Sequence, residues 1–154
     1  MRIIDEGLRS LIYASMSVAV LWASTALAGD NLITKPSKYS VPDTINRIEQ
    51  AVTAKGMTIF ARIDHAGEAK KAGLEMKPME LLIFGNPKGG TPLMVAKPTS
   101  AIDLPMKALA WEDKDGKVWL TYNASKLLQE RHGLSPDLAA RLDPVGKVLE
   151  QTAE

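Results

Sequence analysis

The sequence predicts an α+β fold, a single domain in which helices pack on a mixed central β-sheet of about five strands. Three observations predict this class. The length of 154 residues is typical of one domain. Helix and strand patterns alternate in the first half of the chain, and a hairpin followed by helices closes the second half.

The chain after residue 30 opens with a predicted edge strand and a helix. Residues 31–40 predict a strand at a sheet edge, because Pro36 has no N–H to donate to a neighbouring strand. Residues 41–56 predict a helix, with Pro42 in its first turn and Gly56 at its C-terminal cap. The apolar face of this helix consists of Ile45, Ile48 and Val52.

Two strands and two short helices are predicted next. Residues 57–64 alternate between apolar and polar side chains, as a half-buried strand does. Residues 65–73 predict a short helix. Residues 79–85 form a nearly continuous apolar run, which indicates a strand buried in the middle of the sheet. Residues 91–97 predict one or two helical turns, closed by Pro98.

A hairpin begins the second half. Residues 106–113 and 117–123 flank the sequence KDG at 114–116, and Asp-Gly is a strong signal for a tight turn. Trp111 and Trp119 stand at similar distances from that turn, so we expect them to pair across the two strands.

Helices are predicted to close the chain. Residues 124–133 form a helix that Asn123 can cap and Gly133 can end. Residues 135–153 continue in helical periodicity, and Pro144 is expected to divide them into two pieces. The apolar face of these last residues consists of Leu138, Leu142, Val145 and Leu149.

Composition excludes several classes of function. The chain has no cysteine, which excludes disulfides, thiol catalysis and thiolate metal sites. The formal net charge is +1 and no run of like charges stands out, so we expect no nucleic-acid partner. We predict no cofactor, and the alternative is a zinc or copper ion held by His65 and His132 with Asp64 or Glu68.

The first 28 residues predict an export signal. Residues 11–28 carry no charge, and Ala26-Leu27-Ala28 has the small-x-small pattern of a signal peptidase site. An uncleaved membrane anchor is the alternative, and it would be the only contact with the membrane. Both interpretations place the domain, residues 29–154, in the periplasm or outside the cell.

Four stretches in fixed order carry a resemblance to a known family. They are IDHAGEAKKAGLEMKP, LLIFGNPKGGTPLM, AIDLPMKALAWEDKDGKVWLTYN and RHGL. The chain resembles the DUF302 family of uncharacterised small domains from about residue 32 to residue 152. The resemblance implies a compact α+β domain, homodimers in some relatives, and no established reaction. Its signature positions here are Asp64, His65, Phe84, Gly85, Asn86, Pro87, Gly90, Thr91, Leu104, Pro105, Tyr122 and His132.

The segment at residues 85–91 is the first candidate site. It follows a buried strand and precedes a predicted helix, a geometry in which backbone N–H groups can converge on an anion. The alternative is a structural turn in which the glycines supply positive φ angles. The predicted ligand-binding residues are Gly85, Asn86, Lys88, Gly89, Gly90 and Thr91, together with His132.

The two histidines are the second candidates. His65 could act as a general acid or base oriented by Asp64, or both residues could belong to the start of a helix. His132 lies in the last turn of a predicted helix, where a positive charge suits the helix dipole. Alternatively, His132 could meet His65 across the fold.

Three functions remain open at this level. The leading one is an exported binding or sensing module, homodimeric, for a small polar or anionic ligand held at residues 85–91. The second is an enzyme that uses His65 as general acid or base with Asp64. The third is an accessory protein whose apolar hairpin face binds another protein.

Overall fold

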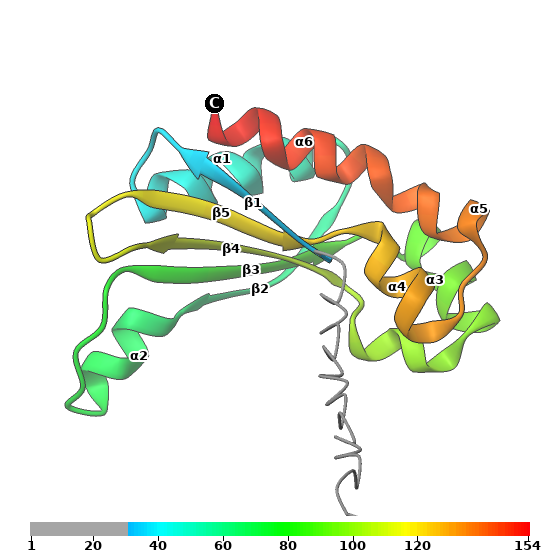
Figure 1. Cartoon of the computed structure of the whole chain (residues 1–154), viewed down its shortest axis with the longest axis horizontal. Helices are drawn as coiled ribbons and strands as arrows, with labels where there is room; N and C mark the ends of the chain where they lie inside the picture. Colours follow the sequence, from blue (N-terminus) through cyan, green and yellow to red (C-terminus); the bar gives the residue numbers. More distant parts are fainter. Residues whose placement is uncertain (1–30) are drawn as a thin grey trace, which may run out of the picture.

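The computed structural model describes residues 31–154, so the predicted signal segment, residues 1–28, lies outside the described residues. The strands are β1 (Leu32–Ser37), β2 (Thr58–Asp64), β3 (Met79–Gly85), β4 (Met106–Glu112) and β5 (Val118–Asn123). The α-helices are α1 (Val41–Ala54), α2 (His65–Lys71), α3 (Pro87–Ala96), α4 (Ser125–His132), α5 (Pro136–Ala139) and α6 (Asp143–Ala153). Two 3-10 helices, η1 (Pro98–Ile102) and η2 (Ala140–Leu142), complete the fold (Figure 1).

The five strands form one sheet in the order β1-β5-β4-β3-β2. The predicted α+β class, with five strands and helices packed on them, is confirmed. All four strand pairings in residues 31–154 are antiparallel, where the sequence predicted a mixed sheet. The reason is the direction of the connections. β2, β3, β4 and β5 follow one another as neighbours in the sheet, whereas the connection through α1 carries the chain from β1 at one edge to β2 at the other, and β1 runs antiparallel to β5.

The two long helices cover one face of the sheet. α1 and α6 lie side by side on that face (Figure 1). α1 begins at Ser40, whose side chain accepts a hydrogen bond from the N–H of Asp43, as an N-cap residue does. The main apolar core fills the space between these helices and the strands, and its buried members are Val41, Ile45, Ile48, Val52, Leu82, Phe84, Ala108, Ala110, Leu120, Tyr122, Val145, Leu149 and Ala153.

A second group of helices stands at one end of the sheet. It consists of α3, η1, α4, α5 and η2, and Figure 1 shows it beside the end of β3 that carries Gly85. Its own apolar cluster contains Leu93, Leu104, Leu128, Leu134 and Leu142. As predicted, the C-terminal helical region is divided, and Pro144 occupies the first turn of α6.

The other face of the sheet, which we call the open face, is not covered by α1 or α6. α2 leaves the sheet on this side, at the Asp64 end of β2 (Figure 1). Register places on this face the side chains that alternate with the core: Ile63, Leu81, Ile83, Leu109, Trp111, Trp119, Thr121 and Thr34. The predicted pairing of Trp111 and Trp119 is confirmed, with ring centroids 6.3 Å apart and an interplanar angle of 24°.

Candidate functional site

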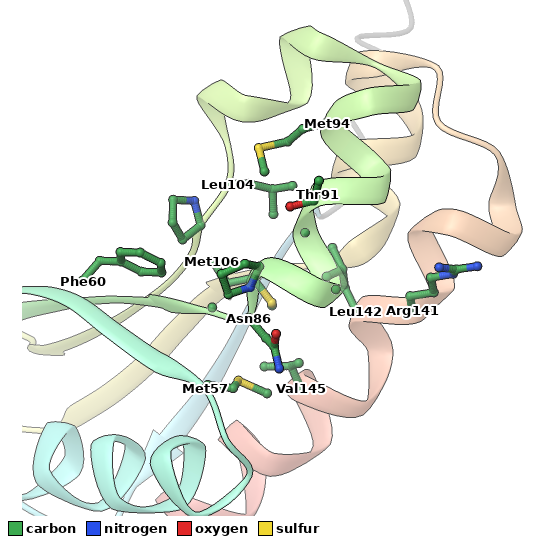
Figure 2. Close-up of a pocket in the computed structure, with 15 residues that line it drawn as sticks. Met57, Phe60, Asn86, Thr91, Met94, Leu104, Met106, Arg141, Leu142 and Val145 are labelled. Atoms are coloured by element: carbon green, nitrogen blue, oxygen red, sulfur yellow. The ribbon is translucent and has the colours of Figure 1, made fainter.

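A pocket of about 260 Å³ lies where β3 runs into α3. It is enclosed by the end of the sheet on one side and by the second helical group on the other (Figure 2). The start of β2, the segment before β4 and the junction of η2 with α6 supply its remaining walls. The lining residues are Met57, Phe60, Gly85, Asn86, Pro87, Gly89, Gly90, Thr91, Met94, Leu104, Pro105, Met106, Arg141, Leu142 and Val145.

The predicted ligand loop is the first turn of a helix. α3 begins at Pro87, earlier than the helix predicted from residue 91. Asn86 is its N-cap, and the side-chain Oδ1 accepts the N–H of Lys88 at 2.9 Å. Pro87 is suited to the first helical position because it has no N–H that needs a partner. The two glycines that follow are therefore helical and do not adopt positive φ angles.

These capping contacts use backbone N–H groups that were predicted to converge on an anion. The carbonyl oxygen of Asn86 accepts the N–H groups of Gly89 at 2.9 Å and of Gly90 at 2.8 Å. Together with the Lys88 N–H on the Asn86 side chain, these are the amides expected to converge on a ligand, and all are bonded within the turn. Lys88 itself is exposed and does not line the pocket. The N–H groups of Lys88, Gly89 and Gly90 are therefore not free to hold an anion.

The segment nevertheless lines the pocket, partly with side chains and partly with glycines that leave space. A Cβ added to Gly85 would lie 3.3 Å from Cβ of Pro105 and 3.8 Å from Cε2 of Phe60. A Cβ on Gly90 would lie 3.9 Å from Cε of Met94. Gly85 and Gly90 therefore leave space that larger residues would occupy. The segment singled out in the sequence therefore lines this pocket through Gly85, Asn86, Pro87, Gly89, Gly90 and Thr91.

The lining is mainly apolar, with three polar groups. Asn86 and Thr91 bring an amide and a hydroxyl, and the exposed Arg141 lies at the edge, with its guanidinium pointing away from the other labelled residues in Figure 2. Three methionines are among the apolar residues, and their flexible thioether side chains adapt to ligands of different shape. Arg141 is the one titratable side chain among the residues that line the pocket. Such a pocket suits binding better than acid–base chemistry.

A smaller pocket of about 140 Å³ shares Met106 and Leu142 with the first. It is more polar. The hydroxyl of Tyr122 donates a 2.8 Å hydrogen bond to Oε1 of Glu150 there. Burial, and after it the hydrogen bond and negative charge of Glu150, raise the pKa of Tyr122 well above its ordinary value of 10.0. Tyr122 therefore stays protonated and acts as a donor.

The structure does not bring Asp64 and His65 together as an acid–base pair. Oδ1 of Asp64 accepts the N–H of Gly67 at 2.8 Å and so caps α2. His65 is the first residue of that helix. Asp64 pairs with Glu80, whereas Gly85 pairs with Thr58 at the opposite end of β2 and β3. The two ends are about 20 Å apart, so His65 lies far from the pocket.

His132 belongs to a different polar cluster. Its Nε2 lies 2.6 Å from Oδ2 of Asp103, and its Nδ1 lies 3.1 Å from Oγ1 of Thr99. Arg131 adds a 3.0 Å contact to Oδ1 of Asp103. This cluster joins α4 to the end of η1 and lines none of the pockets described above. His132 and His65 do not meet. Within residues 31–154 there is no group of three or more His, Cys, Asp or Glu residues placed to hold a metal.

Sequence reasoning missed the pocket residues outside the loop. Met57, Arg141 and Val145 come from segments far apart in the sequence, and nothing local marks them as neighbours. Asp103 was also missed as the partner of His132. Its presence in the motif AIDLP was the only sequence signal for it.

An antiparallel five-stranded sheet with two helices on one face and a pocket at its end defines a small α+β domain. The chain belongs to the family described as "Domain of unknown function DUF302", whose model matches residues 33–152. A solved relative is the crystal structure of uncharacterized conserved protein DUF302 from Bacillus stearothermophilus. It matches 80% of this chain and 95% of its own with a TM-score of 0.67 and 18% identity, which shows a shared fold.

Curated relatives come from Brucella. The chain is 48% identical over 118 residues to "Fluoride-specific ion channel FluC 1" of Brucella suis biovar 1 and to the protein of the same name in Brucella abortus biovar 1. The match takes 75% of this chain, 46% of the first relative and 44% of the second, so the chain spans less than half their length. Within residues 31–154, no helix combines the length and apolar character needed to cross a membrane.

Proposed function

We propose that this chain is an exported binding module whose pocket takes a small, mainly apolar molecule with one polar or anionic group. The carrying observation is the lining: apolar side chains surround most of the space, and Asn86, Thr91 and Arg141 supply the polar contacts. Ligand pockets generally combine an apolar wall with a few placed polar groups. The proposal keeps the predicted position of the site and replaces the backbone-held anion with a ligand held by side chains.

The enzyme alternative has less support. The pocket lining contains no nucleophile with an adjacent base, and His65 lies at the far end of the sheet. The imidazole of His132 contacts the hydroxyl of Thr99 and the carboxylate of Asp103. These residues line neither the main pocket nor the smaller one beside it. Binding without chemistry is therefore the function that the described residues support best.

A ligand panel tests the proposal. Residues 29–154, which contain every described strand and both apolar clusters, are titrated with short-chain carboxylates, the matching alcohols, and inorganic phosphate and fluoride. We expect saturable calorimetric binding and a raised melting temperature with carboxylates, a weaker effect with alcohols, and none with the inorganic anions. A response to inorganic anions alone, or to none of the compounds, would overturn the proposal.

A second candidate follows from the Brucella relatives. Their printed names describe fluoride channels, and the part similar to this chain makes up less than half of each. This observation favours an accessory domain that acts beside a membrane transport protein. The test uses the Brucella suis relative without its matching part, reconstituted in vesicles. The accessory role predicts that added wild-type chain changes fluoride efflux, and unchanged efflux would remove it.

A further inference from the structure

Met106 lines both the main pocket and the smaller, more polar pocket beside it. Leu142, which is buried, is the other residue that the two linings share. Met106 is half-buried, and it packs against both apolar clusters of the fold. The two cavities are therefore adjacent, and the side chains of Met106 and Leu142 form the wall between them.

Strand register explains why Met106 occupies this position. Met106 pairs with Phe84, whose side chain lies in the main core, and directly paired residues of antiparallel strands point to the same face. Ala108, two residues further along β4, pairs with Tyr122. Met106 is therefore a diagonal neighbour of Tyr122, at a separation that long side chains can bridge. Tyr122 belongs to the lining of the smaller pocket.

The helical side of the two cavities has the same division. Arg141 and Val145 line the main pocket, whereas Asp143, Gly146 and Glu150 line the smaller one. These residues belong to η2 and α6, or lie at their junction. A molecule that occupies both cavities therefore lies along the start of α6 and passes Met106 on the side of the sheet.

The smaller pocket offers hydrogen-bonding groups that the main pocket lacks. The hydroxyl of Tyr122 donates to Oε1 of Glu150 at 2.8 Å, so its oxygen can still accept a hydrogen bond. The hydroxyl of Ser125 donates to Oδ1 of Asp143. The lining also includes Lys147, which is exposed. Two carboxylates in this lining disfavour a ligand anion and favour a group that donates a hydrogen bond, such as a hydroxyl.

We infer that the two pockets form one site of two compartments, and that its ligand is an apolar chain with a carboxylate at one end and a hydroxyl at the other. This inference rests on the proposed function, because it specifies the ligand class of the same pocket. The carboxylate stays at the Arg141 edge of the main pocket. A chain long enough to pass Met106 brings its hydroxyl to Tyr122 and Glu150. Methionine suits the shared wall because its unbranched, flexible side chain can turn aside.

Three matched ligand series test the inference by calorimetric titration of the full chain and of residues 29–154. They are unsubstituted carboxylates, ω-hydroxy carboxylates and dicarboxylates, each of increasing chain length. In short chains the ω-hydroxyl should weaken binding, because it is buried without a partner. In chains that reach the smaller pocket it should strengthen binding about five-fold. Dicarboxylates of that length should bind more weakly than both, and Tyr122→Phe should remove most of the hydroxyl advantage.

A variant of Met106 tests its place between the compartments. Met106→Ile keeps an apolar side chain of similar size, but isoleucine is β-branched and stiff at χ1, so it cannot turn aside in the same way. It should remove the hydroxyl advantage in long chains. Met79→Ile is the matched control and should retain that advantage. Met79 is also half-buried and begins a strand, β3, but it lines neither pocket.

A measurement on wild type covers the case in which Met106→Ile fails to fold. With ¹³C-methyl methionine, the Met106 methyl resonance should shift when long ω-hydroxy carboxylates bind, and the Met79 resonance should not. An unresponsive Met106 methyl, or a hydroxyl advantage that persists in Met106→Ile, would overturn the inference. Carboxylates that bind with no hydroxyl advantage at any length would overturn it and leave the proposed function intact. If no carboxylate binds, the proposed function fails, and the site of two compartments fails with it.

Discussion

Nε2 of His132 lies 2.6 Å from Oδ2 of Asp103, and the two side chains are 4% and 10% exposed. The contact joins the end of α4 to the residue that follows η1. Leu104, the next residue in the chain, belongs to the pocket wall. The cluster therefore holds one wall of the pocket against the second helical group. We assign it a structural role.

The first prediction concerns that contact. Asp103→Ala should lower the free energy of unfolding by about 2–4 kcal/mol, because it removes the partner of a buried imidazole and one end of an ion pair. Arg131→Ala is the control. Its side chain is 54% exposed, and we expect a loss of at most about 1 kcal/mol. Urea unfolding followed by circular dichroism measures both. Equal losses would contradict the assigned importance of the His132 contact.

The second prediction concerns the ion pair between β2 and β3, in which Glu80 is buried and Arg62 is exposed. Nε and Nη2 of Arg62 both lie 2.7 Å from Oε2 of Glu80, which is buried. Arg62→Leu should cost about 3 kcal/mol because it leaves the carboxylate without its partner. The double variant Arg62→Leu with Glu80→Leu should recover most of that loss in the same urea experiment. A double variant as unstable as the single one would show that the carboxylate is not the cause.

Alkaline pH provides the third prediction. The raised pKa of Tyr122 means that the folded chain keeps the phenolic proton after the unfolded chain has lost it. The stabilising contribution is complete below about pH 10 and declines as the pH rises above that value. The unfolding midpoint of wild type should therefore fall more steeply above about pH 10 than that of Tyr122→Phe. Tyr39→Phe serves as the control and should keep the wild-type slope.

The fourth prediction distinguishes ligand binding in the pocket from anion binding by Lys88 and the backbone N–H groups of the loop. Gly90→Leu places a side chain beside Met94 and should abolish carboxylate binding. It should not destabilise the fold, because leucine favours a helix by up to about 1 kcal/mol over glycine. Lys88→Ala should bind as wild type does, since Lys88 lies outside the pocket. Calorimetric titration decides between them, and a loss of binding in Lys88→Ala would restore the importance of the loop cation.

Arg141 gives the fifth prediction. Arg141→Ala should reduce the affinity for carboxylates to that for the matching alcohols, because the guanidinium supplies the charge that distinguishes them. The alcohols should bind this variant and wild type equally. Calorimetry with matched carboxylate and alcohol chains measures the difference. A variant that still prefers the carboxylate would assign the polar contact to Asn86 and Thr91 instead.

Local patterns predicted most of the fold. The apolar run at β3, the hairpin turn at Asp115-Gly116 and the Trp111–Trp119 pair are properties of neighbouring residues, so the sequence reveals them. The direction of the strand pairings was missed because the position of β1 beside β5 depends on residues far apart in the chain. The pocket walls from Arg141 and Val145 were missed for the same reason.

The helix start at Pro87 was missed for a local reason. The sequence NPKGG contains residues that favour turns, and the tendency of glycine to break helices outweighed the signal from Asn86 as a cap and Pro87 at the first position. That one difference changes the chemistry, because a capped helix uses its amides internally where an open loop would expose them. The predicted role of the segment therefore depended on whether residues 87–90 are helical or form a loop.

Both outer strands of the sheet carry a feature that hinders further strands from joining. β1 contains Pro36, which has no N–H to donate to an added strand. At the other edge, the pairing of β2 with β3 shifts register between Ile59 and Ala61. An edge strand without such a feature would let strands of successive molecules pair into one continuous sheet, as they do in fibrils. Addition of further strands is thus hindered at both edges of the sheet. The molecule can therefore expose a broad apolar sheet face without polymerising.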